Sequence, residues 1–311
     1  MARPWVPRVN TPAGARCAGK ARRLTDSRKK KHVFADRAAH LLKDFAQEDG
    51  RAILSMKFAK ADFLTEDGVE VALLEDHDQN GACGRRAGRG CCGGLTKRTT
   101  AWIAFKGRDG HNWRRGYKSE QGRLVWLPAR WAGTVCPLNL VRALEKVWHC
   151  VEKHLSSKAR PLVYCVGHSV GGAYAQLCAL RIHAQFPALH DKIEVCTFGA
   201  PPVGNGVFKM AFDKKILHAF RFVHSGDAVP SLGGYTHTKG GLYIVGDKVS
   251  EGFARFSFLA LFRCFVCLGG PLAGASSMLF YREKLREALR VAQRAQKSDP
   301  LRSAPSWMKV S

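Results

Sequence analysis

The sequence predicts an α/β fold, in which helices cover both faces of a mainly parallel β-sheet. Short apolar runs of strand type alternate along the chain with segments of helical periodicity. One such run leads directly into a helix through a glycine-rich turn, from Gly167 to Gly172. The 311 residues suffice for one α/β domain of about 250 residues with extensions. We therefore expect a tail over residues 1–31, one domain over residues 32–297 and a C-terminal tail over residues 298–311.

The N-terminal segment is strongly basic. Asp26 is the only carboxylate in residues 1–31, and such a composition cannot bury a core. We expect a disordered tail, with a membrane-surface arm, a nuclear signal or a transit peptide as the alternatives. The first thirty residues contain no apolar stretch of the kind that a secretory signal needs. The expectation is an intracellular protein, cytoplasmic or membrane-associated, whose cysteines are mostly reduced.

The first elements expected are a helix and two strands. Residues 33–48 have the spacing of an amphipathic helix, and residues 69–74 read as a strand. A Gly/Arg/Cys-rich loop of low complexity follows at residues 81–94, and residues 99–105 return as a strand. We expect this loop to join two neighbouring strands.

The second half alternates more regularly. Residues 138–156 carry apolar side chains at helical spacing, and the strand at residues 161–166 runs into the helix at residues 169–182. The remaining elements are strands at residues 192–198, 218–223 and 241–245, a helix at residues 207–214 and a basic helix at residues 281–297. Residues 257–280 are long and apolar enough to span a bilayer, but glycine and proline interrupt them. We expect core or interfacial packing for that segment.

The segment Gly167-His-Ser-Val-Gly-Gly172 carries the clearest chemical signal. A serine on a sharp turn between a buried strand and a helix has an exposed hydroxyl at the helix N-terminus. Small neighbouring residues let that helix pack close to the sheet. These are the features of a nucleophile elbow, so Ser169 is the first candidate for acyl-transfer chemistry. The structural alternative is a tight turn with an inert serine.

Charge and cysteine spacing limit the partners. The formal net charge of +25 favours an anionic surface, either acidic lipid or nucleic acid. No aromatic-rich nucleic-acid-reading motif accompanies the charge, so lipid is the favoured partner. Cys264 and Cys267 lack a second pair at metal spacing, so no metal site is predicted. No organic cofactor is implied.

Five sequence blocks follow one another over about residues 100–250: Ala104-Phe-Lys-Gly107 with Asn112-Trp113, Gly167-His-Ser-Val-Gly-Gly172, Thr197-Phe-Gly-Ala-Pro-Pro-Val-Gly-Asn205, Arg221-Phe-Val-His-Ser-Gly-Asp-Ala-Val-Pro-Ser-Leu232, and Tyr235-x-His237-x-x-Gly. In these blocks and in their order the chain resembles the class 3 (fungal-type) lipases, which have the α/β-hydrolase fold.

The resemblance assigns roles to four residues. It implies that Ser169 is the nucleophile and that Asp227 is the acid that orients a catalytic imidazole. The backbone N–H groups of Val170 and Arg108 are then the oxyanion-hole donors. His168, beside the nucleophile, is expected to pack rather than to act as a base.

The base is missing where the resemblance expects it. The family's catalytic histidine stands near the C-terminus, in a DHS-x-x-x-Y pattern whose counterpart here ends at Tyr281. That pattern places Ser276 at the histidine position, and no histidine follows His237. Three alternatives remain open: His237 serves as the base, His224 does, or the site is catalytically impaired.

The resemblance therefore supports two functions. The first is a serine hydrolase that cleaves acyl esters of lipids, such as triacylglycerol, a related acylglycerol or a phospholipid. The alternative is a catalytically impaired protein with a lipase fold that binds lipid or an anionic membrane. The incomplete triad separates the two, because a serine at position 276 cannot take up a proton at neutral pH.

Overall fold

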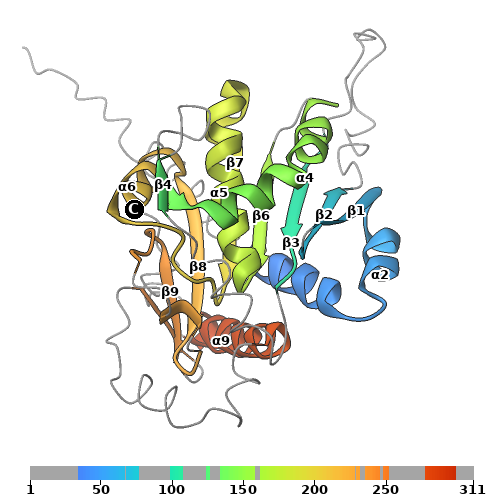
Figure 1. The fold of residues 1–311 in the computed structure, drawn as a ribbon. Coiled ribbons are helices and arrows are strands. Elements are labelled where there is room, and N and C mark those ends of the chain that lie inside the picture. Colours follow the sequence, from blue (N-terminus) through green and yellow to red (C-terminus); the bar gives the residue numbers. More distant parts are fainter. Residues whose placement is uncertain are drawn as a thin grey trace, which may run out of the picture.

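An eight-stranded sheet organises the protein (Figure 1). The computed structural model describes residues 34–66, 68–76, 99–107, 124–126, 134–157, 162–227, 229–231, 235–245, 248–251 and 277–298. The strand order is β1-β2-β3-β6-β7-β8-β9-β10. The strands are β1 (Lys60–Glu66), β2 (Val69–Glu75), β3 (Ala101–Phe105), β6 (Val163–His168), β7 (Ile193–Phe198), β8 (His218–His224), β9 (Gly241–Val245) and β10 (Lys248–Glu251).

The centre of the sheet is parallel and its two ends are antiparallel. Strands β3, β6, β7, β8 and β9 pair in parallel. The pairs β1–β2, β2–β3 and β9–β10 are antiparallel. A second, two-stranded sheet pairs β4 (Leu124–Trp126) with β5 (Val135–Pro137). The predicted mainly parallel sheet is therefore confirmed, and residues 81–94 do connect two neighbouring strands, β2 and β3.

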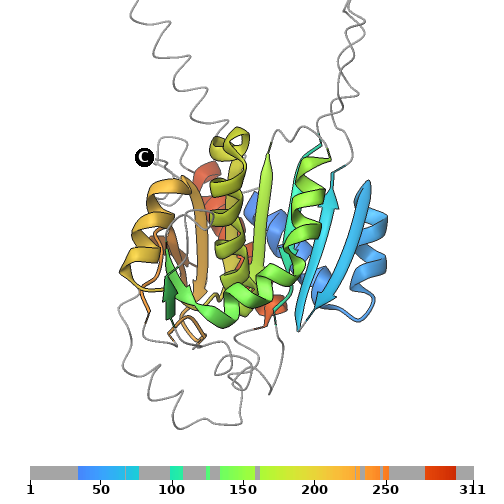
Figure 2. The ribbon, with the colours of Figure 1, turned by 45° about the horizontal axis from the view of Figure 1, so that its top comes forward.

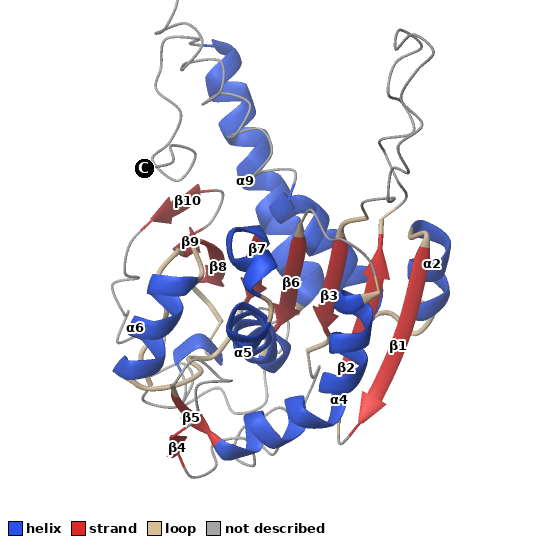
Figure 3. Ribbon diagram, turned by 90° about the horizontal axis from the view of Figure 1, so that it is seen from above, coloured by secondary structure: helices blue, strands red, loops and turns tan. Residues whose placement is uncertain are grey.

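Helices cover both faces of the large sheet (Figure 3). On one face lie α4 (Leu138–Ser156), α5 (Val170–Gln185) and α6 (Gly206–Lys215). On the other lie the helix of residues 34–46 and α9 (Met278–Ser298), which bury a separate apolar cluster against the sheet. Figure 2 shows α4 and α5 in front of the strands and α9 behind them. Each face thus has its own hydrophobic core, as expected for a parallel sheet buried on both sides.

Helix α5 is buried on all sides at the centre of the fold, from Val170 to Ile182. The first turn of α5 can pack this closely against the sheet only because it contains glycines. A Cβ atom on Gly171 would lie 2.4 Å from the carbonyl oxygen of Phe105, and one on Gly172 would lie 2.5 Å from the Cβ of Ala200. These approaches bring the N-terminus of α5 against the ends of β3 and β7.

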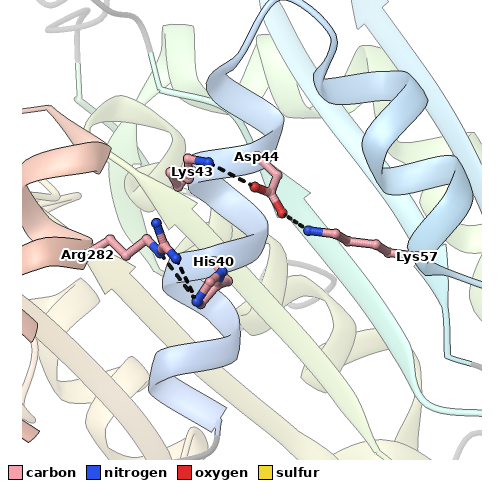
Figure 4. A network of polar contacts seen from close by, with 5 residues as sticks. All are labelled: His40, Lys43, Asp44, Lys57 and Arg282. Carbon is pink, nitrogen blue, oxygen red and sulfur yellow. Dashed lines mark hydrogen bonds and ion pairs between the residues drawn. The ribbon is translucent and has the colours of Figure 1, made fainter. Parts of the chain in front are cut away.

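A polar network joins the helix of residues 34–46 to two other helices (Figure 4). The carboxylate of Asp44 pairs with Lys43 at 3.4 Å and with Lys57, on α2 (Gly50–Lys57), at 2.5 Å. The Nε of Arg282, on α9, donates a hydrogen bond to Nε2 of His40 at 3.3 Å. Burial and the neighbouring Arg282 lower the pKa of His40. The contact therefore needs a neutral imidazole and ties α9 to the N-terminal helix.

The predicted elements are found within a few residues of their expected ends. The elements expected from the sequence did not include α2, β1, β10 or the small β4–β5 sheet. Strand β1 reads KADFLTE and is largely exposed, so it carries no apolar run to detect. The predictions for residues 1–31, 81–94 and most of 257–280 fall outside the described residues. Within the described part of the chain, no helix combines the length and apolarity needed to cross a bilayer.

Candidate active site

Ser169 occupies the turn between β6 and α5 in a strained backbone conformation. Its φ is 51° and its ψ is −129°, and it is the only non-glycine residue with a positive φ in the described part of the chain. The backbone N–H of Ser169 donates to the carbonyl oxygen of Phe198 at 2.9 Å. A Cβ atom on Gly167 would lie 2.2 Å from the carbonyl oxygen of Gly171. The turn is therefore held by glycines on either side and by β7, which is the geometry expected of an elbow.

The predicted oxyanion donors come from two places. Val170 is the first residue of α5, so its N–H lies at the positive end of the helix dipole. The segment after β3 reaches the same spot, because a Cβ on Gly107 would lie 2.5 Å from Nδ1 of His168. Arg108 follows Gly107 directly but lies outside the described residues. The structure thus brings the end of β3 to the elbow. The role of Arg108 as an oxyanion-hole donor stays a prediction.

Asp227 follows β8 and is buried, with 5% of its surface exposed. Its Oδ1 accepts from the N–H of Val229 at 3.0 Å, and its Oδ2 accepts from the hydroxyl of Tyr281 at 2.6 Å. Burial raises the pKa of Asp227 to about 7, although both hydrogen bonds act in the opposite direction. The carboxyl group is therefore close to the point of protonation at neutral pH.

Asp227 and Ser169 approach the same segment of β7. A Cβ on Gly199, whose φ is +59°, would lie 2.4 Å from Oδ2 of Asp227. Gly199 directly follows Phe198, which accepts the backbone hydrogen bond of Ser169. The structure therefore brings the predicted nucleophile and the predicted acid to adjacent residues of one strand end.

Tyr281 is a site residue to which sequence reasoning assigned no role. It lies in the first turns of α9 and is fully buried. Besides donating to Asp227, its hydroxyl accepts from the backbone N–H of His224 at 3.1 Å. Burial and the neighbouring Asp227 raise the pKa of Tyr281, so the phenol stays protonated and remains a donor. The signal for it was the tyrosine that ends the DHS-x-x-x-Y pattern.

The ring of His237 is bound to a backbone carbonyl group. Its Nε2 lies 2.6 Å from the carbonyl oxygen of Pro230. Burial and the nearby Arg221 lower the pKa of His237 to about 4, which leaves the ring neutral with Nε2–H as the donor. Within the described residues no hydrogen bond joins His237 to Ser169 or Asp227. The ring instead holds the turn of Val229–Ser231, whose first residue donates to Asp227.

The other two histidines near the site face elsewhere. Nδ1 of His224 accepts from the N–H of Gly226 at 3.0 Å, and its ring packs edge-on against Phe280 at 4.6 Å. Burial and Lys284 lower the pKa of His224. His168 is buried, and its ring centre lies 6.1 Å from that of Tyr281. Ser276 lies outside the described residues. Within the described part of the chain, no histidine forms a hydrogen bond with Asp227.

The described residues offer no cluster of three or more metal-ligating side chains. Cys136, Cys165, Cys178 and Cys196 are buried free thiols. Burial raises the pKa of Cys136 to about 12, and it raises the pKa of Cys196 as well. These thiols therefore belong to the core.

The chain is similar to lipases in sequence. The family model described as Lipase (class 3) matches residues 110–236. Lipase ZK262.3 of Caenorhabditis elegans is 50% identical over 92 residues, which are 29% of this chain and 26% of that protein. The lipase of Rhizopus niveus is 33% identical over 83 residues, or 26% of this chain and 21% of that protein. The match thus spans about a quarter of the length of these relatives.

Solved structures show the fold. Lipase II from Rhizopus niveus superposes with a TM-score of 0.52 at 18% identity, covering 69% of this chain and 81% of that one. A Rhizomucor miehei lipase in complex with its propeptide gives a TM-score of 0.57 at 16% identity, covering 80% and 79%. The sheet order, the elbow and the family match agree with the resemblance drawn from the five sequence blocks. Residues 110–236 of the chain therefore match the class 3 lipase family, and the chain has the α/β-hydrolase fold of the solved lipases.

Proposed function

We propose that this protein cleaves acyl esters of lipids, with Ser169 as the nucleophile. One observation carries the proposal: Ser169 holds a positive φ at the N-terminus of a buried helix. Strain of this kind costs about 1–3 kcal/mol and persists where the surrounding structure enforces it, which is typical of functional sites. The match of residues 110–236 to the class 3 lipase family supports a lipid or acylglycerol substrate.

The proposed reaction is acyl transfer in two steps. The Oγ of Ser169 attacks the ester carbonyl, and a base accepts the hydroxyl proton. The N–H groups of Val170 and Arg108 stabilise the negative charge that develops on the carbonyl oxygen. The C–O bond to the alcohol breaks as that alcohol takes the proton. Water then attacks the acyl–serine ester, which releases the fatty acid and restores the serine.

Asp227 is the acid in this proposal. A buried carboxyl group with a pKa of about 7 can support an imidazolium, since a nearby positive charge favours the ionised carboxylate. His237 is a poor proton acceptor, because its ring bonds to Pro230 and its pKa is about 4.

The second candidate function is lipid binding with little turnover. It is favoured by the partners of Asp227, whose two oxygens accept from Val229 and Tyr281 and from no imidazole in the described part of the chain. Loss of one triad member leaves roughly 10³–10⁴-fold catalysis over water, far below that of a complete triad. A protein of this kind would still place a lipid ester against Ser169.

A fluorophosphonate probe separates the two functions. Covalent labelling of the unmutated protein, lost in Ser169→Ala, supports the hydrolase. Labelling that requires added imidazole supports a site with a competent serine and no base of its own. If the protein is not labelled under either condition and still floats with acylglycerol emulsion droplets on centrifugation, it binds lipid without hydrolysing it. Equal labelling of Ser169→Ala would remove Ser169 as the nucleophile.

We also propose that the protein acts inside the cell at the surface of anionic membranes. The net charge of +25 supports this, and so do the exposed side chains of Arg286, Arg290 and Arg294 on α9. Each basic residue near an anionic surface contributes about 1 kcal/mol to binding. Co-sedimentation with phosphatidylserine-containing vesicles tests it. Binding that is equally strong to neutral vesicles would contradict the electrostatic account.

A further inference from the structure

A buried arginine lies in β8, and no carboxylate of the described residues pairs with it. Arg221 is 6% exposed. Its Nη2 donates to the hydroxyl of Tyr243 at 3.4 Å, whereas its Nε and Nη1 make no hydrogen bond. Among the described residues no acidic side chain forms an ion pair with it. A guanidinium group cannot lose its proton in a protein, so this charge stays inside the fold.

Among the described residues, the groups that interact electrostatically with Arg221 supply no negative charge. The pKa values that respond to Arg221 are those of His237 and Tyr281, and both side chains are neutral at pH 7. Asp227 is already satisfied by Val229 and Tyr281. An isolated buried charge is one of the most expensive features that a fold can contain. The missing counter-charge must therefore come from outside the described side chains.

The neighbouring strands provide a second donor and a glycine beside the guanidinium group. Thr197 is the register partner of Arg221 on β7, so the two side chains share one face of the sheet. The Oγ1 of Thr197 is also buried and without a hydrogen bond. Gly241 is the register partner on β9, and a Cβ there would lie 2.8 Å from Nη2 of Arg221. The guanidinium group therefore packs directly against Gly241, with no side chain between them.

We propose that Arg221 and Thr197 bind a small monovalent anion of the size of chloride or formate. The Nε–H and Nη1–H groups of Arg221 and the hydroxyl of Thr197 are the donors, and the anion supplies the missing negative charge. A water molecule would satisfy the hydrogen bonds but would leave the guanidinium charge uncompensated. The site joins β7, β8 and β9, and β8 leads directly to the turn that carries Asp227.

Thermal unfolding of the full chain tests the proposal. The melting temperature is measured at constant ionic strength while sodium gluconate, whose anion is large, is exchanged for sodium chloride or sodium formate. Binding to the folded state alone gives a saturable rise of a few degrees in chloride, formate or both. The two salts tell a halide site from a carboxylate site. Bromide in a crystal would give anomalous scattering beside Arg221.

Two matched substitutions make the test specific. Gly241→Glu places a carboxylate beside Arg221, so it should raise the melting temperature in gluconate and abolish the response to the small anion. Gly241→Gln has the same size without the charge and should keep the response. Arg221→Met should lose the response, and if that variant does not fold, the Gly241 pair decides. None of these substitutions changes Ser169, so the anion test can succeed or fail whether or not the fluorophosphonate probe labels the protein.

Two outcomes would overturn the proposal. A melting temperature that is the same in gluconate, chloride and formate would mean that water alone fills the site. Equal behaviour of Gly241→Glu and Gly241→Gln would mean that the charge of Arg221 needs no partner there.

Discussion

The hydroxyl of Tyr281 donates a 2.6 Å hydrogen bond to Oδ2 of Asp227. The two residues are 54 positions apart in the chain, and their contact joins α9 to the end of β8. Because the same hydroxyl accepts from the N–H of His224 at 3.1 Å, Tyr281 fixes both ends of the segment that precedes the acid. Stability and the ionisation of Asp227 should therefore depend on this tyrosine.

The first prediction concerns the phenol itself. Tyr281→Phe keeps the ring but leaves a buried carboxyl oxygen with one donor fewer, which should cost about 1–3 kcal/mol of unfolding free energy. The loss should be larger above pH 7, where the bond is made to a charged group. Urea unfolding at pH 5 and pH 8 measures both effects.

Tyr164→Phe is the matched control for Tyr281→Phe. Tyr164 stacks on Phe34 at 4.3 Å, and its hydroxyl makes no hydrogen bond within the described residues. This change should cost less than about 0.5 kcal/mol. Equal losses for the two variants would show that the bond to Asp227 contributes nothing specific.

The second prediction concerns the pH dependence of stability at Asp227. Its pKa is about 7 in the folded state against 3.8 ordinarily, so between these values the folded state binds more protons than the unfolded state. The group therefore lowers stability as pH rises from about 4 to 7, by a few kcal/mol at most. Asp227→Asn should remove this loss.

The slope, not the absolute stability, is the readout for Asp227→Asn. An amide can accept from Tyr281 but then presents its NH₂ to the N–H of Val229, which adds a constant offset. The difference in unfolding free energy between Asp227→Asn and the unmutated protein should shift in favour of the variant from pH 4 to pH 7. A constant difference across this range would contradict a raised pKa.

The third prediction concerns His237, which acts in the opposite direction. Its folded-state pKa is about 4 against 6.5 ordinarily, so the unfolded state binds the extra proton as pH falls from 6.5 to 4. Stability is lost in that window, by about 3 kcal/mol at most. His237→Gln retains a donor for the carbonyl of Pro230 but does not titrate. The variant should resist acid unfolding better than the unmutated protein, and an unchanged acid midpoint would refute this.

The fold was predictable where burial is complete. Strands β6 and β7 and helix α4 carry apolar residues at a clear period because one face or both are covered. Strand β1 was missed because it is a largely exposed edge, where polar side chains face the solvent. A local apolar pattern reveals a strand only where its side chains are buried. Strand β1 is exposed, and it is defined by its pairing with β2.

The site was predictable only where its geometry is local. Ser169 and the glycines around it form a contiguous motif, because the tight turn leaves no room for larger residues at the glycine positions. The role of Tyr281 depends on a contact between distant segments, which no spacing rule reports. The bond of His237 to Pro230 is similar. The sequence offered His237 as a catalytic base, whereas in the fold the ring is buried and binds the carbonyl oxygen of Pro230.

The fourth prediction tests strain at the elbow. Because Ser169 has a φ of 51°, Ser169→Gly should be more stable than Ser169→Ala by about 1 kcal/mol, since glycine has no Cβ to strain. Ser157 is the control, because its φ of −67° is helical. There alanine should be the more stable by about 0.5–1 kcal/mol. The same order at both positions would show that the elbow stores no strain.

The fifth prediction asks whether the missing base can be restored. Ser276→His places an imidazole at the position indicated by the family pattern, directly before Ser277, whose Oγ accepts from the N–H of Phe280 in the first turn of α9. A positioned general base is worth about 10²–10⁴-fold, so fluorophosphonate labelling should accelerate by at least about 100-fold. The gain should vanish in Ser276→His combined with Ser169→Ala, because the imidazole acts only through the serine. A labelling rate unchanged by Ser276→His would mean that position 276 does not face the elbow. His237 and His224 would then remain as the candidate bases.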